Sequence, residues 1–277
     1  MRKISFLGPE GTYSGFALSE YDSKASRVPC RTFSEALGLL ESDQVTDCIV
    51  PIENSLHGSI VEVLDFLIET PSVKIKNELL IKIDNCLLSK SKMRLSEIEV
   101  LFSHPQPLGQ CKDYINKNLS NAKLIASLST ISAIEDLENS GLKGAVIGPK
   151  WAAEQNNLNI LEEKIDGGLM NITRFVILSK NTSMESTRKD KTSIVFSFDE
   201  DSPGSLFEVL RPFAIRKINL TKIESRPTRK QLGRYYFFID IEGNFNNPEM
   251  KIVLDETLKY TSELKILGSY PKVNYNL

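Results

Sequence analysis

The sequence lacks any strong excess of charge and any long apolar run. Its 277 residues include 36 acidic and 34 basic side chains, which leaves a formal charge of −2. This balance disfavours a nucleic-acid or membrane-surface protein and favours small soluble partners. No apolar run approaches the roughly 18 residues of a membrane span. The start, MRKISFLGPEG, has too short an apolar stretch for a signal peptide, so we expect a cytoplasmic protein.

Cysteine and histidine are also scarce. The widely and unevenly spaced cysteines show no zinc motif and no disulfide framework, which predicts reduced core thiols at Cys30, Cys48, Cys86 and Cys111. With only His57 and His104 available, a metal site of several histidines is not expected. The chemistry must therefore come from other groups.

Strand and helix patterns alternate through the first 180 residues. At 277 residues the chain is past the size at which one core keeps growing, so about two domains are expected. Thr32 followed by Glu35 has the spacing of a capping box at a helix start. Helical periodicity separates extended segments at 3–7, 47–54, 73–89, 98–103, 122–127 and 144–148. The alternation predicts mostly parallel sheets covered by helices.

The order of elements changes after a polar segment. Residues 181–190 contain one large apolar side chain, Met184, which predicts a linker between a domain at 1–180 and another at 191–277. The second region reads strand, helix, strand, strand, helix, strand, the ferredoxin-like βαββαβ arrangement.

Four polar motifs stand where a predicted strand meets the next element. They are GPEGTYS (8–14), PIENSLHGS (51–59), SHPQPLGQC (103–111) and NITRF (171–175). In open α/β sheets, ligands bind in the crevice formed at such strand ends. Backbone N–H groups at the helix starts after Gly11 and near Ser59 would suit an anionic ligand.

Together with PGSLFEVL and ESRP further along, these motifs resemble prephenate dehydratase with a carboxy-terminal ACT regulatory domain. The resemblance implies an α/β catalytic domain with two lobes, like a type II periplasmic binding protein, and a ferredoxin-like ACT domain. The chain would cross between the lobes twice, with about 1–76 and 165–180 in one lobe and about 77–164 in the other. The implied reaction is the decarboxylative dehydration of prephenate to phenylpyruvate, carbon dioxide and water, without a cofactor.

The resemblance makes Thr173 the catalytic group that assists the leaving hydroxyl of prephenate. A free threonine hydroxyl is too weak an acid to act alone, so a polarising partner or a water molecule is needed. Three further residues match positions that orient the substrate, although a helix-cap or turn hydrogen bond is the alternative for each: Asn54, Ser103 and Gln110.

The remaining expected substrate contacts are Thr12, Glu53, Asn171, Arg174 and Phe175. Strand alternation places Asn171, Thr173 and Phe175 on one face and Arg174 on the other. Arg174 could pair with a substrate carboxylate or form an ion pair that supports the lobe, and both options stay open. Glu53 has a similar alternative as a buried carboxylate that fixes the strand end.

The carboxy-terminal domain resembles the family's phenylalanine sensor, which implies L-phenylalanine as allosteric inhibitor and a homodimer or homotetramer. GSLF departs from the usual GALV at Ser205 and Phe207, whereas ESRP matches completely. The expected effector contacts are Gly204, Ser205, Leu206, Phe207, Glu224, Ser225, Arg226 and Pro227.

Two other functions remain open. One is the same chemistry on arogenate, the amino-bearing relative of prephenate. The other is a catalytically silent protein that binds an aromatic acid and signals through the sensor. The presence of Thr173 with its three orienting residues disfavours the silent protein, because a pure binder does not need that hydroxyl.

Overall fold

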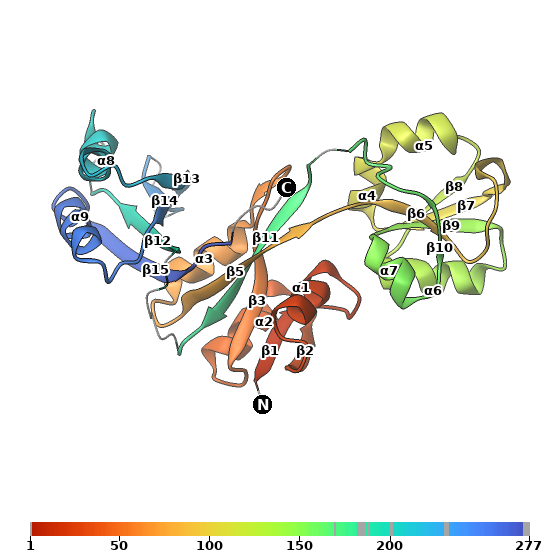
Figure 1. Cartoon of the computed structure of the whole chain (residues 1–277), viewed down its shortest axis with the longest axis horizontal. Helices are drawn as coiled ribbons and strands as arrows, with labels where there is room; N and C mark the ends of the chain where they lie inside the picture. Colours follow the sequence, from red (N-terminus) through yellow and green to blue (C-terminus); the bar gives the residue numbers. More distant parts are fainter. Residues whose placement is uncertain are drawn as a thin grey trace.

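The chain folds around three β-sheets that follow one another along the long axis of the molecule (Figure 1). This computed structural model describes residues 2–168, 170–181, 187, 189–199, 202–229 and 233–273. The first lobe lies in the middle, the second lobe (yellow and green) at one end and the carboxy-terminal domain (blue) at the other. The carboxy-terminal domain therefore packs on the first lobe, away from the second.

The first lobe is built on a six-stranded sheet with the order β2-β1-β3-β11-β5, in which β4 pairs with β3. Its strands are β1 (Lys3–Leu7), β2 (Ser26–Cys30), β3 (Asp47–Asn54), β4 (Gly58–Ser59), β5 (Lys74–Lys82) and β11 (Ile172–Ser179). The helices of this lobe are α1 (Tyr13–Tyr21), α2 (Phe33–Glu41) and α3 (Val61–Glu69). Thr32 accepts a hydrogen bond from the Glu35 backbone at 3.0 Å, so the predicted start of α2 is confirmed.

The second lobe has a five-stranded sheet with the order β10-β6-β9-β7-β8. Its strands are β6 (Cys86–Ser89), β7 (Val100–Ser103), β8 (Lys123–Ala126), β9 (Gly144–Gly148) and β10 (Asn159–Glu162). Its helices are α4 (Pro105–Gln110), α5 (Lys112–Asn118), α6 (Thr130–Ser140) and α7 (Lys150–Gln155), with a short 3-10 turn η1 (Leu95–Glu97). The strands predicted near 98–103, 122–127 and 144–148 are confirmed.

Two segments cross between the lobes, one from β5 to β6 and one from β10 back to β11 (Figure 1). We expected the first crossing near residue 76, but β5 stays in the first sheet as far as Lys82, because it pairs with β11 along its whole length. The expectation of mostly parallel sheets was also wrong. The returning strand β11 is antiparallel to both of its neighbours, and β6 is antiparallel to β9, so both sheets are mixed.

The carboxy-terminal domain is a four-stranded antiparallel sheet with the order β13-β14-β12-β15. Its elements are β12 (Asp190–Ser197), α8 (Ser205–Ile215), β13 (Leu220–Pro227), β14 (Tyr235–Glu242), α9 (Pro248–Leu258) and β15 (Glu263–Pro271). The predicted βαββαβ order is confirmed. Much of the expected linker, residues 182–186 and 188, lies outside the described residues.

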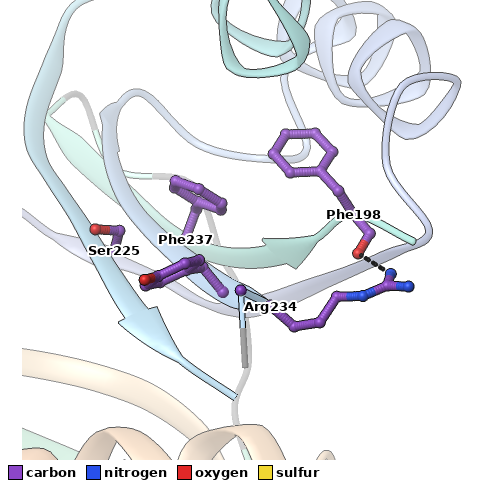
Figure 2. A pocket seen from close by; sticks show the side chains of 6 residues that line it. Phe198, Ser225, Arg234 and Phe237 are labelled. Carbon is purple, nitrogen blue, oxygen red and sulfur yellow. Dashed lines mark hydrogen bonds between the residues drawn. The ribbon is translucent and has the colours of Figure 1, made fainter. Parts of the chain in front are cut away.

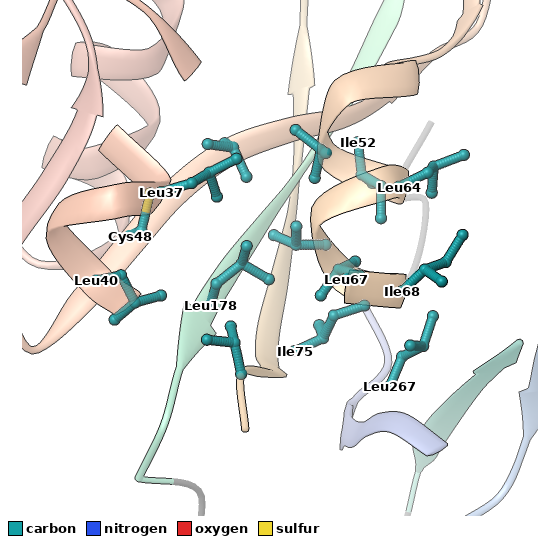
Figure 3. Close-up of a cluster of buried hydrophobic side chains, with 14 of the residues drawn as sticks. Leu37, Leu40, Cys48, Ile52, Leu64, Leu67, Ile68, Ile75, Leu178 and Leu267 are labelled. Carbon is teal, nitrogen blue, oxygen red and sulfur yellow. The ribbon is translucent and has the colours of Figure 1, made fainter. Parts of the chain in front are cut away.

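One apolar core joins the carboxy-terminal domain to the first lobe (Figure 3). Figure 3 shows Leu267 of β15 beside Ile68 and Ile75 of the first lobe. A Cβ on Gly268 would lie 2.2 Å from the Ile75 carbonyl oxygen, so only glycine lets β15 come this close to β5. The two domains are therefore packed together as tightly as the parts of a single domain.

No helix within the described ranges combines the length and the apolar character that a membrane crossing requires. All four cysteines are buried and free, which confirms the predicted core thiols.

Candidate active site

The polar motifs of β3 and β11 lie side by side at one edge of the first sheet. Asn54, the last residue of β3, is the register partner of Thr173 in β11. The Asn54 Nδ2 donates to Thr173 Oγ1 at 2.9 Å and to Asn171 Oδ1 at 2.8 Å. Three residues expected at the site therefore form one hydrogen-bonded group.

The amide of Asn54 is fixed in the orientation that these bonds need. Its Oδ1 accepts hydrogen bonds from the backbone N–H groups of Leu56 and His57, both at 3.0 Å. Its NH₂ group must then point towards Thr173. Because Thr173 Oγ1 accepts from Asn54, the hydroxyl proton of Thr173 is left for another acceptor, and the accepted bond makes it a stronger donor. This geometry makes Asn54 the candidate polarising partner for Thr173, a group that the sequence could not identify.

Gln110 approaches this region from the second lobe. Its Oε1 accepts from Asn85 Nδ2 at 3.0 Å, and its Nε2 lies 3.1 Å from Nε2 of His57 in the first lobe. Asn85 is 1% exposed, and within the described residues its Oδ1 has no hydrogen-bond partner. Gln110 therefore stands at the junction of the lobes, bonded to Asn85 of the crossing segment and to His57 of the first lobe.

The lobes also meet through aromatic rings. Phe16 of α1 stacks on Trp151 of α7 with 5.2 Å between ring centroids and 5° between planes, and Tyr13 meets Trp151 edge-on at 5.9 Å. Burial raises the pKa of Tyr13, and the charge of Asp84 raises it further, so the phenol stays protonated. A Cβ on Gly11 would lie 1.9 Å from Ile131 of the second lobe. The GPEGTYS segment therefore bridges the two lobes.

Two expected ligand contacts also have a role in the fold. Ser103 is fully buried and donates to the Ile147 carbonyl at 3.1 Å. Thr12 caps α1, accepting from Gly15 N–H at 3.3 Å and donating to the Leu7 carbonyl at 3.1 Å. A hydroxyl can donate one hydrogen bond and accept two, so the contact of each residue with the substrate stays a prediction.

Phe175 is likewise a core residue. It is 2% exposed and packs with Phe6 and Ile49 inside the first lobe. It lies on the face that alternation predicted, but two residues further into the sheet than Thr173, beyond the polar edge. Its expected contact with substrate is therefore corrected to core packing.

Glu53 and Arg174 point to the other face of the sheet, towards the carboxy-terminal domain. Arg174 forms ion pairs with Glu78 at 2.8 Å and Asp240 at 2.5 Å, and Glu53 pairs with Lys222 at 3.1 Å. Of the two roles left open for Arg174, the supporting ion pair is the one observed. Its assignment as a substrate contact, and that of Glu53, is corrected.

Sequence reasoning missed His57 and Asn85. His57 was not expected to be required, although its place three residues after Asn54 in a turn was a signal. Asn85 follows Asp84 as a polar interruption of the apolar run at 79–88, a pattern typical of a crossing between lobes. In the described ranges, no group of three or more His, Cys, Asp or Glu side chains is arranged to hold a metal ion.

A second site lies around the start of α8. A cavity of about 470 Å³ is lined by residues 204–207 together with Phe198 and Phe237. Gly204 has φ 91°, and a Cβ there would meet only open space. A neighbouring cavity of about 250 Å³ shares the two phenylalanines and adds Ser225 (Figure 2). The GSLF residues and Ser225 are therefore gathered around two aromatic rings.

The ESRP segment divides between two faces of β13. Ser225 lines the smaller cavity, whereas Glu224 accepts a hydrogen bond from Ser59 and Arg226 forms an ion pair with Asp65 of α3. A strand sends alternate side chains to opposite faces, so the four residues cannot share one pocket. Within this chain, Glu224 and Arg226 contact the first lobe instead of the cavity, whereas Pro227 shares the face of Ser225 and its contact with the effector stays a prediction.

Residues 4–183 match the family model of prephenate dehydratase, and residues 192–251 match that of the ACT domain. The chain belongs to the prephenate dehydratase family. The first matched region corresponds to the two lobes and the second to most of the βαββαβ domain, which is therefore an ACT domain.

Members of the family resemble the whole chain. The prephenate dehydratase of Methanocaldococcus jannaschii is 36% identical over 275 residues, spanning 98% of both chains. An Arabidopsis thaliana relative named arogenate dehydratase/prephenate dehydratase 1, chloroplastic, is 35% identical and covers 97% of this chain and 71% of its own length. The solved structure of Arthrobacter aurescens prephenate dehydratase in complex with L-Phe has a TM-score of 0.84 and 33% identity, covering 98% of this chain and 90% of that one. These similarities confirm the two-lobed fold followed by an ACT domain.

Proposed function

We propose that this protein carries out the decarboxylative dehydration of prephenate to phenylpyruvate, carbon dioxide and water, a step towards L-phenylalanine. The observation that carries the proposal is the hydrogen bond from Asn54 Nδ2 to Thr173 Oγ1 at 2.9 Å. It leaves the Thr173 proton available at the edge of the sheet where the two lobes meet. Membership of the prephenate dehydratase family supports the same reaction.

The chemistry needs positioning and proton donation more than covalent catalysis. Formation of the aromatic ring supplies the driving force, so the protein must hold one conformer and assist the leaving groups. The bond from the ring to its carboxylate breaks, its electron pair enters the ring, and the ring C–O bond breaks. Thr173 donates a hydrogen bond to the departing oxygen, which takes up a proton and leaves as water. The proton passes from Thr173 to this oxygen, and Thr173 regains one from solution through a water molecule, so the reaction takes up one proton overall.

The groups around Thr173 have complementary roles in this proposal. Asn54 polarises the Thr173 hydroxyl, and Asn171 accepts a second hydrogen bond from the same NH₂ group of Asn54. Gln110 and His57 join the lobes over the site at 3.1 Å and help to exclude water from the departing carboxylate. Gln110 is then placed to orient the substrate from the opposite lobe.

L-phenylalanine is proposed as the inhibitor that binds the cavity at the start of α8. The backbone N–H groups of this eleven-residue helix can bind the amino-acid carboxylate, and Ser205 adds a hydroxyl. Phe198 and Phe237 provide an apolar surface for the aromatic ring of the ligand. The L-Phe complex of the Arthrobacter aurescens protein supports this class of ligand.

Arogenate is the second candidate substrate. The similarity to the Arabidopsis thaliana relative named arogenate dehydratase/prephenate dehydratase 1 favours it, since arogenate differs from prephenate in having an ammonium group in place of the keto group. Incubating the purified protein with each substrate, and separating phenylpyruvate from phenylalanine by chromatography, tests both. Phenylpyruvate formed faster from prephenate supports the proposal, faster conversion of arogenate supports the alternative, and binding without turnover supports a silent binding protein.

We also propose that the enzyme works in the cytoplasm as a homodimer or homotetramer. The near balance of charges and the small-molecule substrate support the location. Exposed apolar side chains on the ACT domain support the assembly: Phe207 is 64% exposed, Ile215 67% and Ile223 49%. Analytical ultracentrifugation measures the assembly, and a monomer at micromolar concentration would contradict it.

A further inference from the structure

The strand pair that carries Asn54 and Thr173 has a second face, which the ACT domain contacts. The chain neighbours of these residues, Glu53 and Arg174, are themselves register partners across β3 and β11. Side chains alternate along a strand, so Glu53 and Arg174 point away from the side occupied by Asn54 and Thr173. A displacement of Glu53 and Arg174 therefore also displaces the backbone of Asn54 and Thr173, the candidate catalytic pair.

Arg174 is held from two domains at once. It is 6% exposed. Its Nη1 donates to Asp240 of β14 at 2.5 Å and its Nη2 to the Tyr270 hydroxyl of β15 at 2.7 Å, both in the ACT domain. Its Nε donates to Glu78 of β5 in the first lobe at 2.8 Å. Each of the three guanidinium nitrogens therefore donates a hydrogen bond, one to the first lobe and two to the ACT domain.

Further buried groups complete this network. Lys191 donates to both carboxylate oxygens of Glu78 at 2.9 Å, and Ser193 donates to Asp240 at 2.5 Å. Burial is the largest single effect and would raise the pKa of Asp240, but Arg174, Ser193 and Lys191 together hold that pKa below its usual value. Two buried cations therefore face two buried carboxylates, and displacing one member leaves another without its partner.

Glu53 provides a second link to the ACT domain. Its carboxylate lies 3.1 Å from Lys222 Nζ on β13 and 3.7 Å from Arg174 Nη1. The Lys222 side chain is 12% exposed. The neighbour of Asn54 and the neighbour of Thr173 are thus each bonded to a different strand of the ACT sheet.

The same two strands line the effector cavities. Ser225 follows Lys222 by three positions on β13, and Phe237 precedes Asp240 by three on β14. Residues three apart on a strand lie on opposite faces and about 10 Å from each other. Each strand therefore presents one side chain to a cavity and another to the catalytic strand pair.

We propose that the Glu53–Arg174 pair couples the effector cavity to Thr173. Occupation of the cavity shifts β13 and β14, the ion pairs of Lys222 and Asp240 transmit that shift, and the geometry between Asn54 and Thr173 changes. Glu53 and Arg174 are positioning residues in this mechanism, because they act on the reaction only through their neighbours. The inference rests on the proposed function for the reaction and for the inhibitor.

Asp240→Asn tests the coupling with little change in shape. The amide keeps an acceptor for Ser193 but removes the charge that faces Arg174. Glu256→Gln is the matched control, since Glu256 pairs with Arg216 at 2.7 Å within the ACT domain. Calorimetry gives the affinity for L-phenylalanine, and phenylpyruvate formation gives the inhibition. We expect Asp240→Asn to bind L-phenylalanine within about threefold of the parent while its inhibition weakens about tenfold, with the control unchanged.

Trp151, the single tryptophan of the chain, gives a second readout at the contact between the lobes. L-phenylalanine should change its emission in the parent and in Glu256→Gln, and much less in Asp240→Asn. If thermal unfolding shows that Asp240→Asn does not fold, Lys222→Gln takes its place, because it removes the charge that faces Glu53.

A folded variant that binds L-phenylalanine and is inhibited like the parent overturns the coupling. The parent protein could show no turnover and still change its Trp151 emission when L-phenylalanine is added. If Asp240→Asn abolishes that change, the proposed reaction is rejected and the coupling is retained. A parent that shows neither turnover nor a Trp151 response rejects both.

Discussion

Asn54 Nδ2 lies 2.9 Å from Thr173 Oγ1, a bond between side chains that are 119 positions apart in the sequence. The antiparallel return of β11 beside β3 creates this contact, because it brings the start of one strand to the end of the other. A hydroxyl that is already accepting one hydrogen bond donates its own proton more readily. The relationship between these two residues therefore links the topology of the first lobe to the proposed chemistry.

Thr173→Ala removes the donor to the departing hydroxyl. We expect kcat to fall by roughly 10² to 10⁴ while the substrate KM changes little, because the lost bond matters most in the transition state. Thr173→Ser keeps a hydroxyl and should retain most of the activity. Steady-state assays of phenylpyruvate check both variants, and near-normal turnover in Thr173→Ala would exclude Thr173 from the mechanism.

Asn54→Asp replaces the NH₂ donor by an oxygen that can only accept when ionised. Thr173 would then donate its hydrogen bond to the new carboxylate and not to the departing oxygen, so we expect kcat to fall by about 10². Asn118→Asp on α5 is the matched control, since Asn118 donates to the Tyr114 carbonyl of its own helix at 3.1 Å, away from Thr173. Equal activity of the two variants would show that polarisation by Asn54 is not needed.

Gly204→Val should damage the effector site and spare the reaction. Gly204 combines φ 91° with open space towards the cavity, so valine adds strain and fills room meant for the ligand. We expect L-phenylalanine affinity to fall about 100-fold, since overfilling a packed site typically costs about 1–3 kcal/mol. Gly141→Val is the control, because Gly141 has φ 66° and equally open space at the end of α6. Calorimetry on both variants decides, and intact affinity in Gly204→Val would rule out this cavity.

Acid should loosen the contact between the ACT domain and the first lobe. Burial opposes ionisation of Asp240, but Arg174 keeps its folded pKa below the value of roughly 3.9 in an unfolded chain. A lowered folded pKa stabilises the native state above the unfolded pKa, and this stability is lost as the pH falls through the folded pKa. Between about pH 5 and 2, the unfolding free energy of the parent should therefore fall more steeply than that of Asp240→Asn. Urea unfolding at several pH values gives both slopes, and equal slopes would contradict the prediction.

Much of the fold could be predicted from local patterns. The helix start at Thr32, the strand at 47–54 and the βαββαβ order all appear as expected, because each depends on residues close together in the chain. The parallel arrangement and the crossing at residue 76 were wrong. Both depend on how far β11 pairs with β5, which follows from contacts almost 100 residues apart.

The candidate site was predictable only where the motif residues meet at the sheet edge. Asn54, Asn171 and Thr173 come together there, whereas Gln110 contacts Asn85 and His57 at the junction of the lobes. Alternation placed Arg174 on the opposite face, but the sequence could not show that Asp240 of another domain occupies that face. The sequence also could not show the bond of Ser103 to a backbone carbonyl inside the second lobe, because that bond leaves no trace in its own motif.

The most direct test of the account is the rate at which the intact protein forms phenylpyruvate from prephenate, with and without L-phenylalanine. The structure predicts turnover that L-phenylalanine suppresses, since the first lobe, which holds Thr173, shares one apolar core with the ACT domain, which holds the α8 cavity. Absence of phenylpyruvate, or a rate that L-phenylalanine leaves unchanged, would contradict it.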